Sequence, residues 1–138
     1  IQMDGGTLAH ATLSFASMRG ARLGQPNMLC TNLNNADLTE ACLDGCHFDG
    51  VKMDGANLDG ASLRQTHWED TVASRLSACS ADFSGAIIEK SVLDGNFQNS
   101  RWMGMRAVGA NFEDSDFLGA HVQDVVVKDT VGWAPSTS

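Results

Sequence analysis

The sequence predicts an all-β protein, a parallel β-helix built from tandem five-residue repeats. Three observations support this fold class: a large apolar residue recurs at every fifth position, a small residue stands two positions before it, and glycine or a polar residue closes most repeats. A period of five matches neither the 3.6-residue period of an amphipathic helix nor the two-residue period of an alternating strand. We therefore expect each repeat to combine a short extended segment with a corner.

The repeat is clearest from residue 36 to residue 70, where the pentads read ADLTE, ACLDG, CHFDG, VKMDG, ANLDG, ASLRQ and THWED. Positions one and three of an extended segment point to the same side, so they are expected to face a common core. Positions four and five must then turn the corner. Glycine at position five suits that turn because it accepts the required dihedral angles without steric cost.

The pattern contains one shift and one weak stretch. Leu93 and Phe97, both at large positions, are four positions apart rather than five. We expect a tightened corner between them, at residues 94–96. The stretch 71–80 fits the repeat worst, because Leu76 stands where a small residue is usual. A bulge is expected there, either as a recognition feature or as a tolerated irregularity.

The pentads resemble the consensus of the pentapeptide-repeat family, and ADLTE, ANLDG, ADFSG and ANFED are close to it. The resemblance covers nearly the whole chain. It implies that four pentads make one square coil of about 20 residues and that the coils stack into a right-handed quadrilateral β-helix. The implied domain has about six to seven coils over residues 1–131, followed by a tail at 132–138, and is roughly 30 Å long.

A coil of four pentads predicts which side chains stack. Trp68 is followed at large positions by Ala73 and Ala78, which indicates volume compensation in a narrow core. The four expected columns are Leu23, Leu43, Leu63, Phe83, Trp102 and Val122; Met28, Phe48, Trp68, Ile88, Ala107 and Val127; Leu33, Met53, Ala73, Leu93 and Phe112; and Leu38, Leu58, Ala78, Phe97 and Phe117.

The composition restricts the classes of function. Nine Lys plus Arg stand against 17 Asp plus Glu, for a formal net charge of −8. This balance argues against direct binding to nucleic acid, whereas it permits binding to a basic protein surface. No run approaches the ~20 apolar residues of a membrane span, and residues 1–13 show no signal peptide. A first residue of Ile1 rather than methionine suggests a fragment or a processed product.

The cysteines match no zinc-binding spacing, since the sequence has no CxxC pair. We expect reduced thiols in a reducing compartment, which is the bacterial cytoplasm or, for a secreted protein, the host cell cytoplasm. The four cysteines are Cys30, Cys42, Cys46 and Cys79.

No catalytic motif of the GxSxG, P-loop, HExxH or GxGxxG type occurs, and the sequence predicts neither an enzyme nor a cofactor. A series of Asp residues precedes corner glycines, but consecutive pentads face four different sides, so the series cannot form one cluster. Asx turns explain Asp before Gly without any function. The series comprises Asp44, Asp49, Asp54 and Asp59.

Stacked columns bring acidic residues together instead. Asp49, Glu69 and Glu89 occupy the same place in three successive coils, and we call this column the acidic ladder. Like charges about 5 Å apart repel by roughly 1 kcal/mol or less in water, so the ladder is tolerable. It is either a partner-binding surface or ordinary solubilising charge. Further acidic residues are Asp70 beside the ladder and Asp54, Asp94, Glu113 and Asp114 on the adjoining face.

Two further surface features stand out. His47 and His67 stack beside the acidic ladder, either as a metal-binding or pH-sensing pair or as incidental exposed imidazoles. Met103 and Leu118 point outward near Trp133, and such an apolar patch would cap the rod or mediate association. The sequence shows no capping helix, so we expect a neighbouring domain, a partner or a second copy to cover the strand edges at the ends.

Together these observations predict a non-catalytic scaffold for protein–protein interaction. The resemblance implies a domain of a bacterial secreted effector, because some such effectors carry rods of this kind. The alternative is a DNA mimic that binds a type II topoisomerase, DNA gyrase. The acidic net charge fits that alternative, whereas the short length and the missing C-terminal helical dimer cap count against it.

Overall fold

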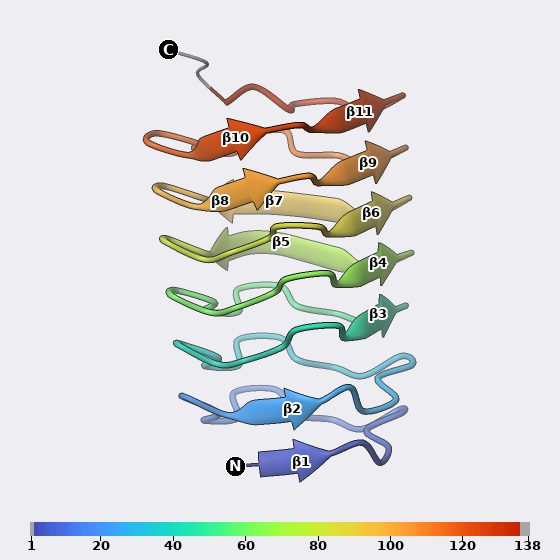
Figure 1. The fold of residues 1–138 in the computed structure, drawn as a ribbon. Helices are drawn as coiled ribbons and strands as arrows, with labels where there is room; N and C mark the ends of the chain where they lie inside the picture. The colour runs from blue at the N-terminus through green and yellow to red at the C-terminus, as the bar shows by residue number, and fades with distance from the viewer. Residues whose placement is uncertain (1, 136–138) are drawn as a thin grey trace.

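The computed structural model describes residues 2–135 and shows a rod of stacked coils (Figure 1). Near-side strands run left to right and β5 and β7 on the far side run right to left as the chain climbs, so the winding is right-handed. The fold is an all-β parallel solenoid of about six turns, as predicted. None of the described residues belongs to a helix long and apolar enough to cross a membrane.

Most strands are short because each occupies the extended part of one pentad, and all paired strands are parallel. The longest sheet has the order β11-β9-β6-β4-β3. The strands are β1 (Gln2–Asp4), β2 (Arg22–Gly24), β3 (His47–Asp49), β4 (His67–Glu69), β5 (Val72–Ser77), β6 (Ile87–Glu89), β7 (Val92–Asn96), β8 (Arg101–Met103), β9 (Arg106–Val108), β10 (His121–Gln123) and β11 (Val126–Lys128).

The observed register confirms the predicted columns. Phe48 pairs with Trp68 and Trp68 with Ile88, in each case four pentads further along the chain. Across the frame shift the coil is one position shorter, as in the pairing of Ile88 with Ala107. Ala73 pairs with Leu93 on another side of the rod. The four-pentad coil therefore holds on both sides of the shift.

The core is a narrow column of large side chains at position three and small ones at position one. Trp68, Ala73 and Ala78 are all fully buried, in agreement with the expected volume compensation. The rings of Phe83 and Trp102 stack with centroids 4.3 Å apart and an angle of 4° between planes. Burial of each large side chain contributes about 1.5–3 kcal/mol to folding, so the coils are held together mainly through this column.

Each buried indole finds a hydroxyl two positions earlier, a pairing that the sequence did not predict. Trp68 Nε1 donates to Thr66 Oγ1 at 2.8 Å, and Thr66 in turn donates to the Leu63 carbonyl. Trp102 Nε1 donates likewise to Ser100 Oγ at 2.6 Å. A buried indole N–H needs such a partner, which explains a polar residue at the small core position.

The weak stretch and the frame shift are one feature. The predicted bulge is confirmed, because the register shifts between Ala73 and Leu76 of β5 where β5 pairs with β7. The expected tightened corner at residues 94–96 is wrong, since β7 runs as a continuous strand through it. Leu76, the large residue at a small position, pairs directly with Gly95. The missing side chain at Gly95 leaves room for the Leu76 backbone, which a Cβ at Gly95 would overlap.

The two ends of the rod differ. The Trp133 ring packs over the C-terminal end of the core, with centroids 5.0 Å from Phe117 and 5.1 Å from Trp102. Trp133 therefore closes the core rather than extending the surface patch, although Leu118 is 70% exposed as expected. At the N-terminal end Phe15 is 78% exposed. Of the predicted domain and tail, residue 1 and residues 136–138 lie outside the described part of the chain.

Replacing Gly95 by alanine is expected to destabilise the protein by about 3 kcal/mol, because the new Cβ overlaps the Leu76 backbone and the residue has a φ of +145°. Gly20→Ala is the matched control, since Gly20 has a φ of +65° but no atom within 4 Å of a new Cβ; a loss of about 1 kcal/mol is expected from backbone strain alone. Urea unfolding measures both. Equal losses would show that the contact between Gly95 and Leu76 is unimportant.

Candidate binding face

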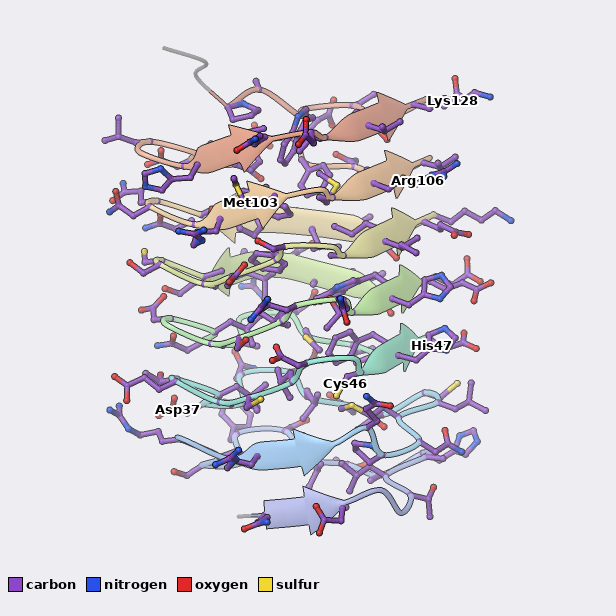
Figure 2. All side chains as sticks on the ribbon, viewed as in Figure 1. Asp37, Cys46, His47, Met103, Arg106 and Lys128 are labelled. Atoms are coloured by element: carbon purple, nitrogen blue, oxygen red, sulfur yellow. The ribbon has the colours of Figure 1, made fainter. Side chains whose placement is uncertain are left out.

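One side of the rod carries the features singled out in the sequence, and we call it the binding face. It is the outer surface of the five-stranded sheet β11-β9-β6-β4-β3. Figure 2 shows His47 on β3, Arg106 on β9 and Lys128 on β11 along the same edge of the rod. Position two of its pentads holds His47, His67, Ile87, Arg106 and Val126, and position four holds Asp49, Glu69, Glu89, Val108 and Lys128.

The structure brings the three residues of the acidic ladder together. Asp49 pairs with Glu69, and Glu69 pairs with Glu89. The next residue in the column is Val108, so the ladder ends there. Their carboxylates make no side-chain hydrogen bond among residues 2–135. The ladder is thus available for contact with another molecule.

The other predicted acidic residues have different surroundings. Asp54 Oδ1 accepts a hydrogen bond from the Ser74 amide at 3.0 Å, and Asp94 Oδ1 accepts one from the Arg75 amide at 2.8 Å. Both carboxylates therefore satisfy backbone groups of a neighbouring coil. Asp70 lies exposed at a corner with a φ of 47°.

The Asp-Gly corners have a structural role, but not through Asx turns. Asp44 Oδ1 accepts from the Arg64 amide and Asp59 Oδ1 from the Cys79 amide, each at 2.9 Å and each in the following coil. Asx-type contacts occur instead at position two, as between Asp37 and the Thr39 amide at 3.1 Å. Hydrogen bonds from Thr39 hold the pKa of Asp37 below its ordinary value, with the Thr39 hydroxyl the largest cause.

The two histidines lie directly against the ladder. Their rings stack with centroids 4.5 Å apart and 7° between planes. Each faces the carboxylate of the following coil: His47 Nε2 lies 3.6 Å from Glu69 Oε2, and His67 Nε2 lies 3.4 Å from Glu89 Oε1. Each imidazole therefore lies diagonally beside a ladder carboxylate of the following coil.

The C-terminal half of the binding face is basic, which the sequence analysis missed. Arg106 and Lys128 are exposed on β9 and β11, and Lys90 follows β6. Counting one shortened coil forward from Ile87 would have placed Arg106 in the histidine column. The face therefore carries the acidic ladder on β3, β4 and β6 and the basic side chains Arg106 and Lys128 on β9 and β11, although the exposed Asp129 follows Lys128. Ile87, 39% exposed, lies between the two groups.

A shallow hollow of about 520 Å³ opens beside His47 and is lined by Pro26, Met28 and Leu29 among others. Cys30 N donates to Asp49 O at 2.9 Å, but no backbone hydrogen bond among the described residues joins Pro26 or Met28 to His47. Backbone hydrogen bonding between these two coils is therefore interrupted beside Pro26, where the hollow lies.

All four cysteines lie within the described residues and are free. Burial raises the pKa of the Cys46 thiol to about 11 and also raises the pKa of Cys79. A thiolate is the reactive form of cysteine, so the buried Cys46 is chemically inert at neutral pH. Cys30 is exposed.

Comparison with known protein families identifies the same five-residue repeat. The family model for pentapeptide repeats matches in eight copies, over residues 16–55, 31–67 and 56–95. No curated protein matches the chain.

Among solved structures, Rfr23 from the cyanobacterium Cyanothece is 23% identical over 70% of this chain, with a TM-score of 0.33; the chain spans 60% of its length. HetL from the cyanobacterium Nostoc, a protein involved in heterocyst differentiation regulation, is 20% identical over 100% of this chain and 90% of its own, with a TM-score of 0.29. QnrB1, a plasmid-mediated fluoroquinolone resistance protein, is 21% identical over 86% and 72%, with a TM-score of 0.35. Identities and scores this low transfer no property of these proteins to this chain.

Proposed function

This chain belongs to the pentapeptide-repeat family, and we propose that it is a non-catalytic scaffold for protein–protein interaction. Members of the family are generally structural or interaction proteins. The observation that carries the proposal is the charge division of the binding face. The acidic ladder occupies β3, β4 and β6, whereas Arg106 and Lys128 occupy β9 and β11.

A protein surface with the inverse order of charge fits this face. The strands fix the spacing of successive charges at about 4.8 Å, so only side chains need to be ordered on binding. Because acidic groups lie at one end of the face and basic groups at the other, one orientation of the partner is favoured and the reverse orientation is disfavoured. Val126, which is 57% exposed, and Ile87 supply apolar contact on the same face.

Reversing the charges of the acidic ladder is expected to weaken binding of the partner protein. The triple variant D49K/E69K/E89K should lower recovery of the partner on immobilised protein by at least about tenfold, because each lysine meets a basic group across the interface. Quantitative affinity purification measures the loss, and titration with the purified partner confirms it.

The matched control is E40K/D114K/D124K, which changes the net charge equally at exposed positions away from the ladder. This variant should retain the partner. Equal loss in both triple variants would mean that net charge alone, and not the binding face, governs binding.

We further propose that the scaffold is a domain of a bacterial secreted effector, on the strength of the resemblance described above. The full gene is expected to encode another folded domain before or after this rod. Sequencing the flanking DNA tests this directly. A gene whose reading frame encodes only these residues would contradict the effector assignment and leave the scaffold proposal intact.

The net charge of −8 also favours a second candidate, a DNA mimic that binds DNA gyrase. A DNA mimic needs continuous negative potential, and the basic half formed by Lys90, Arg106 and Lys128 interrupts it on this face. We therefore expect no effect of micromolar protein on gyrase supercoiling or on its inhibition by a fluoroquinolone. Inhibition or drug protection that the triple variant D49K/E69K/E89K abolishes would favour the DNA mimic over the scaffold.

A further inference from the structure

The pairing of β3 with β4 assembles three metal-ligating side chains on the binding face. Because the strands pair in register, His47 lies directly opposite His67, and Glu69 lies opposite Asp49 further along the same two strands. One ligand atom from each of His47, His67 and Glu69 lies within 4.8 Å of the others. From this geometry we propose that the three residues bind a divalent cation of the Zn²⁺ class.

These groups face one another without hydrogen bonds. Nε2 of His67 is shielded from solvent and has no hydrogen-bond partner among the described residues, although the side chain as a whole is 37% exposed. The nearest carboxylate oxygen, on Glu89, is 3.4 Å away but makes no hydrogen bond. His47 Nε2 is likewise 3.6 Å from Glu69 Oε2. Shielded polar atoms are normally partnered, and a cation coordinated by these groups would supply the partner.

The donor set selects the class of cation. Two imidazole nitrogens and one carboxylate oxygen suit Zn²⁺ and its transition-metal neighbours, whereas Mg²⁺ and Ca²⁺ prefer oxygen ligands alone. Three protein ligands leave one tetrahedral position, which water or Glu89 can fill. The remaining carboxylate of the ladder, Asp49, adds negative charge that favours a cation at this place.

Binding of one ion by both imidazoles requires one ring to turn out of the stack, because the ring planes are within 7° of parallel and their in-plane nitrogen lone pairs do not converge. Tetrahedral Zn²⁺ with bonds of about 2.0–2.1 Å holds its ligand atoms about 3.3 Å apart. The pair formed by His47 and Glu69 is already at 3.6 Å. No two of the three ligand atoms are more than 4.8 Å apart, and rotation of the His47 side chain, which is 52% exposed, would bring its nitrogen toward the ion. The backbone pairing of β3 and β4 is unchanged.

The full chain is first treated with chelator and then titrated with Zn²⁺, with binding measured by isothermal titration calorimetry. Thermal unfolding is measured with and without Zn²⁺. One Zn²⁺ per chain is expected to bind and to raise the melting temperature, because ligand bound only by the folded state stabilises it. Mg²⁺ at the same concentration should do neither. Failure of the wild-type protein to bind Zn²⁺ saturably would overturn the proposal.

Variants locate the site. His47→Ala and His67→Ala should each weaken Zn²⁺ binding by at least about tenfold, and Glu69→Gln, which keeps the side-chain shape, should do so as well. His121→Ala is the matched control, since His121 lies exposed on β10 outside the cluster. Circular dichroism of each variant establishes that the fold is kept. Retained affinity in the two histidine variants, or equal loss in His121→Ala, contradicts the assignment.

Cysteine is the competing ligand, and Cys30 is exposed. The variant Cys30→Ser should bind Zn²⁺ as tightly as the wild type. Co²⁺ bound in place of Zn²⁺ should give the visible bands of a tetrahedral site without thiolate-to-metal charge transfer. A thiolate-to-metal charge-transfer band, or a loss of Zn²⁺ affinity in Cys30→Ser, would show that cysteine binds the ion and would contradict the histidine site. The triple variant D49K/E69K/E89K also removes the proposed ligand Glu69, so the partner assays are run with chelator present. Partner binding then reports on the scaffold proposal without bound Zn²⁺, and each proposal fails separately.

Discussion

The hydrogen-bonded stacking of one coil on the next, in parallel and at a fixed register, governs the rest of the structure. It places each residue over the one four pentads earlier, with one position fewer across the frame shift. The core is therefore a column of fixed cross-section, and an increase in volume in one coil must be offset in the next. Leu76 and Gly95 show how closely the coils approach, because a Cβ at Gly95 would overlap the backbone of Leu76 in the adjacent coil.

The same register arranges the surface, where stacking brings like residues together whether or not the contact is favourable. His47 lies on His67, and Asp49 on Glu69, because β3 and β4 cannot slip without exposing Phe48 and Trp68. The same stacking sets each histidine diagonally against a glutamate of the following coil. Burial of the core thus fixes the geometry of the binding face. The spacing of the surface side chains is set by buried residues that are not themselves on the surface.

Phase counting predicted the columns and the acidic ladder because both depend only on the spacing of residues. Phase counting failed for contacts that depend on the direction of a side chain or on structure outside the repeat. The hydroxyl partners of Trp68 and Trp102 depend on rotamers, and Trp133 closes the core from outside the repeat. Spacing alone also relates the bulge to the frame shift, since Gly95 lies one shortened coil after Leu76. Asp54 and Asp94 do not belong to the candidate site, because each carboxylate accepts a hydrogen bond from a backbone amide of another coil. Spacing along the sequence does not show these bonds.

This separation of roles shows which acidic residues are free to change. Asp44, Asp54 and Asp59 bind backbone amides of the next coil, so replacing them leaves a polar group without its partner and weakens the corner. The carboxylates of the acidic ladder make no such bond within the described residues, and stacking them is mildly unfavourable. Carboxylates that repel one another and accept no hydrogen bond from a backbone amide fit the proposal of a surface that acts on another molecule. The fold tolerates the ladder, and we propose that contact with a cation or a partner protein accounts for its presence.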